Sequence, residues 1–123
     1  MNTKVDPREL AFLVAARAND LYLPYQMGAV IVDRSGRVVS WGWNHRGDNA
    51  KAFSIHAERH AIMRANPARL KNSTLYVAGI RRGTERVLCA MPCKSCWDFV
   101  KSKGIVLILW SDPTNAWARI SKN

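Results

Sequence analysis

Three nearly continuous apolar runs dominate the hydrophobic pattern of the chain. They cover residues 28–33, 74–80 and 105–110, and none alternates regularly between apolar and polar positions. Runs of this kind are typical of strands that are buried on both faces of a sheet. A fourth strand is predicted over residues 37–43, because the short glycine-containing turn at 34–36 is a hairpin signal.

Helical patterns separate these strands. Asp6 can cap a first helix and Pro7 fits its first position, while the alanines that follow favour helix. Pro67 ends a second helical pattern, and Gly104 is a good residue to follow a third. We predict helices over residues 7–19, 56–65 and 93–103, and a short final helix over residues 115–122.

The order of the elements indicates an α/β fold. The first two strands are expected to pair antiparallel. Helix 93–103 links two apolar strands, and a crossover of this type places its strands parallel. Residues 87–89 extend the sheet locally. We therefore predict one domain, residues 1–123, with a mixed sheet of about five strands and helices on both faces.

The charge of the chain is high for its size. Nineteen lysines and arginines stand against nine aspartates and glutamates, which gives a formal net charge of +10. One interpretation is an anionic partner, either a nucleotide phosphate or a nucleic acid. The other is a soluble basic surface without a specific partner, because the basic residues are scattered along the sequence.

The remaining composition bears on the compartment. The N-terminal residues lack the apolar core of a signal peptide, and no apolar run approaches the roughly 20 residues of a membrane helix. We therefore expect cytoplasmic residence and no membrane association. Three cysteines are an odd number, and two of them form a C-x-x-C, which indicates metal or redox chemistry in a reducing compartment.

Two short motifs carry the chemistry. One holds His56 and Glu58, and the other holds Cys93 and Cys96 three residues apart after Pro92. An imidazole and two thiolates make the ligand set of a catalytic zinc ion whose fourth position is open to water. Glu58 is then free to move protons. Both motifs open predicted helices, and the partial positive charge of a helix N-terminus favours thiolates.

The pattern H-x-E followed by P-C-x-x-C resembles the cytidine and deoxycytidylate deaminase superfamily. Segments 28–32, 42–44, 74–77 and 104–105 also resemble the family's strands, so the similarity covers most of residues 10–111. The resemblance implies a three-layer α-β-α fold and a Zn²⁺ cofactor. It further implies hydrolytic deamination of a cytosine nucleoside or nucleotide, with release of ammonia.

The resemblance also suggests the substrate contacts. Asn44 lies where family members carry an asparagine that contacts the substrate, and we expect it to bind a ribose hydroxyl. A backbone N–H near Ala57 is expected to help hold the water or the leaving group. The predicted loop 44–54, with His45, Arg46 and Lys51, is a candidate for phosphate contact, although a solvated loop fits it nearly as well. Family members are usually oligomeric, so a homo-oligomer is expected.

Three alternatives stay open at this stage. An editing deaminase that acts on adenine or cytosine in RNA or single-stranded DNA is favoured by the charge. The second alternative is a nucleic-acid-binding module in which the zinc site is not catalytic. His60 lies four residues after His56, so these two histidines could form a closed Cys2His2 structural site with the cysteine pair. We instead expect His60 to be a surface or core-edge residue.

Other residues are assigned to packing. Cys89 is expected to be a small buried hydrophobic residue, and Trp97 and Trp110 are expected in the core. Trp41 and Trp43 alternate along a strand and therefore share a face. Either one could line the pocket, but packing is the expected role of each.

Overall fold

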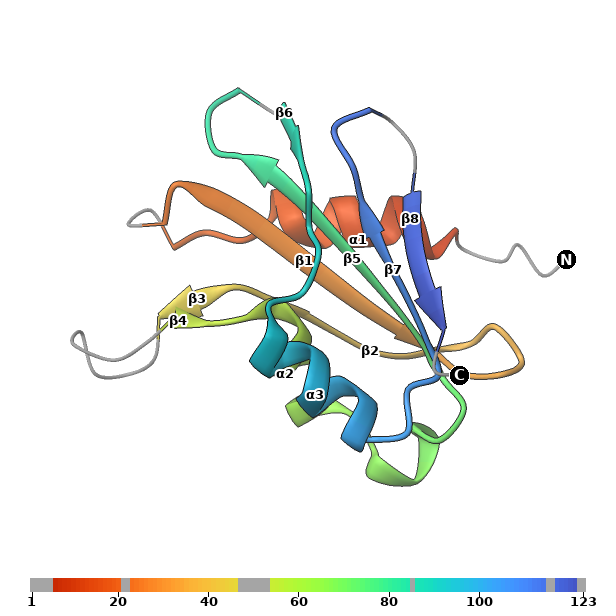
Figure 1. The fold of residues 1–123 in the computed structure, drawn as a ribbon. Coiled ribbons are helices and arrows are strands. Elements are labelled where there is room, and N and C mark those ends of the chain that lie inside the picture. The colour runs from red at the N-terminus through yellow and green to blue at the C-terminus, as the bar shows by residue number, and fades with distance from the viewer. Residues whose placement is uncertain (1–5, 21–22, 47–53, 85, 115–116, 122–123) are drawn as a thin grey trace, which may run out of the picture.

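The computed structural model describes residues 6–20, 23–46, 54–84, 86–114 and 117–121 (Figure 1). Its elements follow the predicted alternation of helices and strands. In chain order they are α1 (Pro7–Ala16), β1 (Tyr25–Val32), β2 (Val38–Trp43), β3 (His45–Arg46), β4 (Ser54–Ile55), α2 (Ala57–Arg64), η1 (Pro67–Arg69, a 3-10 helix), β5 (Thr74–Arg81), β6 (Arg86–Leu88), α3 (Lys94–Ser102), β7 (Leu107–Ser111) and β8 (Trp117–Ser121).

The sheet is mixed, as predicted. Its strands follow the order β2-β1-β5-β7-β8, and β6 pairs with β5 beside this path. β1 pairs antiparallel with β2 and with β5, whereas β5 and β7 are parallel. Helix α3 makes the crossover between these two parallel strands, which confirms the predicted connection.

Helices cover both faces of this sheet (Figure 1). α1 packs on one face, where Ala11 and Val14 meet Val30 and Ala78 in one hydrophobic cluster. On the other face, α2 and α3 contribute to a larger cluster, which also contains alternate residues of β1 and β5. The predicted three-layer α/β fold is therefore confirmed.

Two strand glycines let the helices approach the sheet closely. A Cβ atom at Gly28 would lie 2.3 Å from the carbonyl oxygen of Ala11 in α1. A Cβ atom at Gly42 would lie 2.3 Å from the backbone nitrogen of Ala61 in α2. Each helix thus rests with its backbone directly on a glycine, one on each face of the sheet.

The prediction of a helix at the C-terminus was wrong. Residues 117–121 form β8, which pairs antiparallel with β7 at the edge of the sheet. Trp117 makes edge-on ring contacts with Phe12 and Tyr76. Aromatic side chains favour a pleated, half-buried surface, and this packing outweighs the helical tendency of so short a segment.

Three smaller predictions also need correction. Cys89 is exposed, because it follows the end of β6, and the adjacent Ala90 is the residue buried at this point. Trp97 and Trp110 are half-buried and pack edge-on against each other at the border of the core. The first helix ends at Ala16, and the buried Gln26 side chain donates hydrogen bonds to the carbonyl oxygens of Ala16 and Ala18 beyond that end.

β2 is the outer strand of the described sheet, and a cation covers its aromatic side chains. The Arg64 guanidinium, from the last turn of α2, lies 4.8 Å from the ring centre of Trp41 and 5.1 Å from that of Trp43. This arrangement agrees with the prediction that the two tryptophans share a face. Among the described helices, none has the length and apolar character needed to cross a membrane.

Candidate metal centre and active site

The two predicted motifs lie at the starts of two helices. His56 occupies the N-cap position of α2 and Cys93 that of α3, and both have extended backbone conformations. Neither side chain forms a capping hydrogen bond to its helix. Both side chains are therefore available to each other, and the two helix N-termini bring them together.

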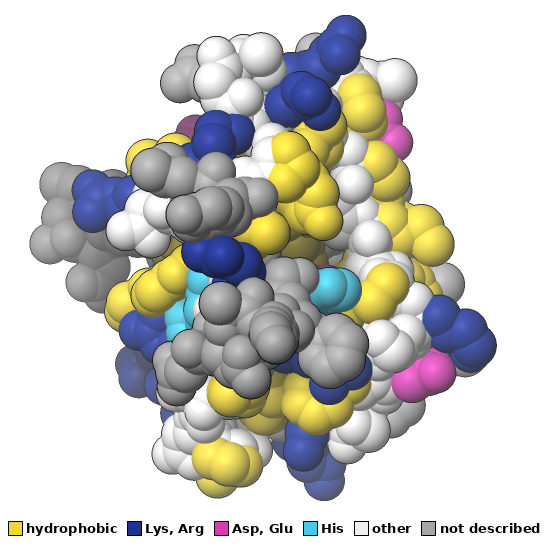
Figure 2. Space-filling view, turned by 90° about the vertical axis from the view of Figure 1, so that its left-hand side faces the viewer, with side chains coloured by type: hydrophobic (Ala, Val, Ile, Leu, Met, Phe, Trp, Pro, Cys, Tyr) yellow, Lys and Arg dark blue, Asp and Glu magenta, His cyan; other side chains and the backbone are white. Residues whose placement is uncertain are grey.

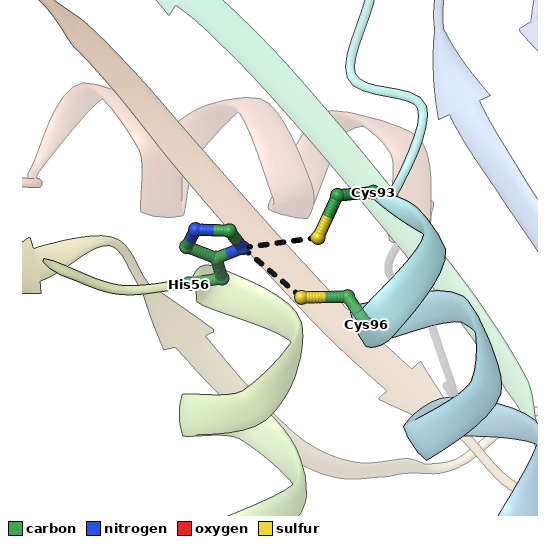
Figure 3. Close-up of side chains that lie close together, drawn as sticks. All are labelled: His56, Cys93 and Cys96. Atoms are coloured by element: carbon green, nitrogen blue, oxygen red, sulfur yellow. Dashed lines mark hydrogen bonds between the residues drawn. The ribbon is translucent and has the colours of Figure 1, made fainter. Parts of the chain in front are cut away.

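His56, Cys93 and Cys96 meet at one point (Figure 3). The His56 Nδ1 atom lies 3.0 Å from the Cys96 Sγ atom and 3.7 Å from the Cys93 Sγ atom. The three ligand atoms all lie within 4.8 Å of one another. A tetrahedral zinc ion with ordinary bond lengths separates nitrogen from sulfur by about 3.6 Å and sulfur from sulfur by about 3.8 Å. The cluster therefore fits such an ion after small side-chain movements.

The two thiols differ in acidity. Burial raises the pKa of Cys96 to about 12, and the nearby Glu58 carboxylate adds to this rise. Burial also raises the pKa of Cys93, but the Ser95 hydroxyl and the polar backbone at the start of α3 outweigh this effect and lower the pKa to about 7. Because metals bind thiolates, a cation at this cluster must displace a proton from Cys96.

Glu58 lies in the first turn of α2, where its residue is only 5% exposed. Burial raises the pKa of its carboxyl group, because a charged carboxylate loses hydration in this position. The partial positive charge at the start of a helix stabilises the charged form. A carboxyl group with a raised pKa is suited to accept a proton and to return it.

Two residues of the cluster, His56 and Cys93, line one cavity of about 140 Å³ together with Glu58. Its mouth is open, and its described walls come from β1, the start of α2 and the segment that leads into α3. The lining residues are Tyr25, Met27, Asn44, His56, Ala57, Glu58, Ala90, Met91 and Cys93. The predicted site residues His56, Ala57, Glu58, Cys93 and Asn44 therefore face the same space. Cys96 is not part of the lining, but its Sγ atom lies next to the His56 Nδ1 atom. Neither Trp41 nor Trp43 belongs to this described lining.

Asn44 is buried and already holds part of the backbone. Its side-chain oxygen accepts a hydrogen bond from the Met27 N–H at 2.7 Å, and its side-chain nitrogen donates to the Tyr25 carbonyl at 3.0 Å. These bonds continue the pairing of β1 beyond the end of β2. One N–H and one lone pair of the amide remain for a ligand in the cavity.

His60 stands outside the metal cluster. Its Nδ1 atom accepts a hydrogen bond from the Trp43 N–H at 3.1 Å, and its ring packs edge-on against those of Trp43 and His45. Burial and the nearby charges of His45 and Arg64 lower the pKa of His60 to about 4. In the described part of the chain the cluster has three ligands, which argues against the closed Cys2His2 site.

Sequence reasoning missed four residues of the cavity wall: Tyr25, Met27, Ala90 and Met91. The first two alternate on β1, so a strand prediction that began at residue 25 could have found them. Of the predicted phosphate loop, His45 and Arg46 belong to β3, which pairs with β4. Arg46 forms an ion pair with Asp20 at 3.0 Å. Lys51 lies outside the described residues.

Comparisons with known proteins agree with this geometry. No curated protein matches the sequence. Among solved structures, the chain is similar to a cytidine deaminase from Burkholderia pseudomallei, with a TM-score of 0.69 and 21% identity over 94% of this chain and 89% of that one. A cytidine deaminase from Mycobacterium tuberculosis gives a TM-score of 0.59 and 26% identity, over 88% of this chain and 83% of the other.

A third structure, a dCMP deaminase from the cyanophage S-TIM5, gives a TM-score of 0.62 and 20% identity, with 86% of this chain and 79% of that one covered. Residues 1–111 match the family described as the cytidine and deoxycytidylate deaminase zinc-binding region. That match spans both helix starts and every residue of the cavity wall. The chain therefore belongs to the cytidine and deoxycytidylate deaminase family.

Proposed function

We propose that this protein hydrolyses the amino group of a cytosine nucleoside or nucleotide, giving the uracil form and ammonia. His56, Cys93 and Cys96 would hold a zinc ion, whose chemistry is to lower the pKa of a bound water toward neutrality. The observation that carries this proposal is a buried carboxyl group, Glu58, that lines the same cavity as His56 and Cys93 of the three-residue cluster.

In the proposed reaction Glu58 moves the protons. It takes one from the attacking water and delivers it to the ring nitrogen next to the carbon that carries the amino group. It then takes the remaining proton from the hydroxyl group that has added to this carbon and passes it to the amino group, which departs as ammonia. Glu58 therefore acts as a base and as an acid in turn. Ala57 contributes its backbone N–H at the start of α2, and the remaining hydrogen-bonding groups of Asn44 bind the sugar.

The size of the cavity favours a pyrimidine. An engineered apolar cavity of about 150 Å³ holds one benzene molecule, and the cavity here measures about 140 Å³. One six-membered ring therefore fills it, and the sugar is left at the open mouth. The cyanophage dCMP deaminase has been solved in complex with dCMP and dUMP, which are cytosine and uracil nucleotides.

The alternative substrate is a base within RNA or single-stranded DNA. The net charge of +10 favours it, because a strand carries a phosphate at every residue. Such a substrate would place its base in the same cavity, so the chemistry of Glu58 would not change. We also propose that the protein forms a homo-oligomer. Light scattering tests this by measuring the molar mass in solution.

The test is ammonia release from zinc-loaded protein with a panel of substrates. The panel holds cytidine, CMP, dCMP, adenosine and short DNA and RNA oligomers that contain one cytosine or one adenine. We expect ammonia from cytosine compounds and none from adenosine. Release from adenine compounds alone would contradict the cytosine assignment, and zinc-loaded protein that releases ammonia from no compound would contradict the deaminase proposal.

A further inference from the structure

Three residues form a row across one end of the sheet, next to the mouth of the cavity. Tyr25 at the start of β1 lies opposite Arg81 at the end of β5, and Arg81 lies opposite Arg86 at the start of β6. Side chains of residues paired in this way lie on the same face of the sheet. Tyr25 lines the cavity, so the row begins at the cavity wall.

The face of this row follows from the core. Leu75 and Val77 of β5 belong to the cluster under α2 and α3, and Arg81 has the same parity in the strand as they do. Arg81 therefore stands on the face that holds the cavity. Gly79 occupies the position between them, where Met27, another residue of the cavity wall, packs against it.

Within the part of the chain that the structure describes, no acidic side chain compensates the charge of the two arginines. Both are exposed, and no ion pair joins either to another described residue. Residues 81–86 contain three arginines and one glutamate. The third arginine, Arg82, uses its guanidinium group to bind the carbonyl oxygens of Leu23 and Asp20, so it holds the backbone in place.

Figure 2 shows the charges on this side of the molecule. Dark blue side chains lie at the top of the view, at the height of the β5–β6 hairpin, as well as lower down, and magenta side chains are few. Like charges that face each other across a strand pair destabilise it. The pair Arg81–Arg86 therefore weakens the hairpin unless an anion lies between or beside its guanidinium groups.

We propose that Arg81 and Arg86 form a phosphate-binding rim, which makes this site selective for phosphorylated cytosine substrates over free cytidine. This inference rests on the proposed deaminase function for the identity of the base. A guanidinium group binds phosphate oxygens with two parallel hydrogen bonds. A substrate with its base in the cavity and its sugar at the mouth presents its phosphate outside, where the row leads from Tyr25 to the arginines.

The test compares the double variant Arg81→Ala/Arg86→Ala with a matched control, Arg34→Ala/Arg37→Ala. The control also removes two exposed arginines, but from the turn at the other end of β1. Two quantities are measured. One is kcat/KM for cytidine, dCMP and a short single-stranded oligonucleotide with one cytosine, and the other is the equilibrium affinity for uridine, dUMP and the corresponding uracil oligonucleotide.

We expect the rim variant to lower the affinity for phosphorylated ligands about 10- to 100-fold, since one charge-assisted hydrogen bond contributes about tenfold. The selectivity for dCMP or the oligonucleotide over cytidine should fall by the same factor. Arg81→Lys/Arg86→Lys should recover part of it. A loss for dUMP identifies a terminal phosphate, whereas a loss confined to the oligonucleotide identifies a phosphodiester, and either loss supports the rim.

The proposal is overturned if the rim variant and the control change kcat/KM and affinity by the same factor for all six compounds. Binding separates this failure from that of the proposed function. If no compound releases ammonia while dUMP or the oligonucleotide still binds through Arg81 and Arg86, the deaminase assignment fails and the rim stands.

Discussion

The helices on the two faces of the sheet begin in different ways. α1 starts with an ordinary cap, in which the Asp6 carboxylate accepts a hydrogen bond from the Arg8 N–H at 2.9 Å. α2 and α3 start with His56 and Cys93, whose side chains turn away from their helices and toward each other. A missing cap lowers stability by about 1 kcal/mol. On the face with the site, α2 and α3 lack this stabilisation, and their N-cap side chains instead provide candidate ligand atoms at two helix N-termini.

The first turns of α1 and α2 show the same contrast. Each contains a glutamate, but Glu9 of α1 is exposed and Glu58 of α2 is buried in the cavity wall. Glu9 has a position that merely suits a helix start, because negative charge is favoured there. Glu58 occupies the same kind of position in surroundings that oppose its charge. This difference separates a structural acid from a candidate catalytic one.

The largest expected effect comes from removal of a metal ligand. Cys96→Ser should abolish zinc binding and deaminase activity and should lower the melting temperature, because metal binding is coupled to folding. Metal content, activity and melting temperature test this. Cys89→Ser is the matched control, since this cysteine is exposed and outside the cluster. One zinc ion per chain in the Cys96 variant would refute the ligand assignment.

Glu58→Gln should affect activity alone. The substitution keeps the shape of the side chain but cannot move a proton, so kcat should fall by about 10²- to 10⁴-fold. The melting temperature should stay at the wild-type value or rise, because burial disfavours the carboxylate form. Glu9→Gln on α1 should leave kcat within experimental error. Equal activity of the two variants would remove the contrast between the two glutamates.

The two glycine contacts should respond differently. A Cβ atom at Gly28 or at Gly42 meets helix backbone, so each alanine variant should lose about 1–3 kcal/mol of unfolding free energy. Only Gly42→Ala shifts α2, which carries His56 and Glu58, and it should also lower kcat by about 10- to 100-fold. Urea unfolding and steady-state kinetics measure both. A comparable loss of kcat in Gly28→Ala would mean that α1 also positions the site.

Loss of the α1 cap should have a smaller effect, confined to stability. Asp6→Ala should cost about 1 kcal/mol of unfolding free energy, because the Arg8 N–H loses its partner. Asp6→Asn retains an acceptor and should remain near wild type. Urea unfolding compares the three proteins, and their kcat values should agree. A changed kcat in Asp6→Ala would show that the two faces are coupled.

At neutral pH the smallest expected effect is that of His60, because its contribution to stability changes only in acid. The pKa of His60 is about 4 in the folded protein, below the ordinary value of about 6.5 for an unfolded chain. Between these values the unfolded state binds more protons, so the stability that His60 contributes is complete above about pH 6.5 and is lost as the pH falls toward 4. Wild type should therefore lose more stability than His60→Gln between pH 7 and pH 4.5, at equal metal content. If the stability of the two proteins falls equally with pH, His60 does not have a lowered pKa in the folded protein.

The sequence predicted the architecture well because its central strands are continuous apolar runs. The apolar runs 28–33, 74–80 and 105–110 predicted strands between two layers of helices, and β1, β5 and β7 lie within these runs or overlap them. Spacing alone indicated that His56, Cys93 and Cys96 would lie together, and the structure places their ligand atoms within 4.8 Å of one another. The edge of the sheet was less predictable. β8 pairs with the backbone of β7, and its Trp117 ring packs against Phe12 and Tyr76. Both contacts join segments that are distant in the sequence or depend on the finished sheet.

Contacts between distant segments could not be predicted from the sequence. Asn44 is tied to Tyr25 and Met27, which lie 19 and 17 residues earlier, and no local pattern predicts such bonds. The rim arginines likewise face each other only after the strand register is fixed, because a turn separates them in the sequence. Cys89 illustrates the opposite error, since a generally buried residue type lies at an exposed strand end.

The Arg64 guanidinium over Trp41 and Trp43 also bears on self-association. An outer strand offers unpaired N–H and C=O groups, to which another chain can add as a further strand. Exposed aromatic rings on that strand would strengthen such contacts. A fixed positive charge above both rings places two like charges together whenever two copies approach along this edge. The same stacking that joins α2 to β2 therefore opposes edge-to-edge aggregation of the folded protein.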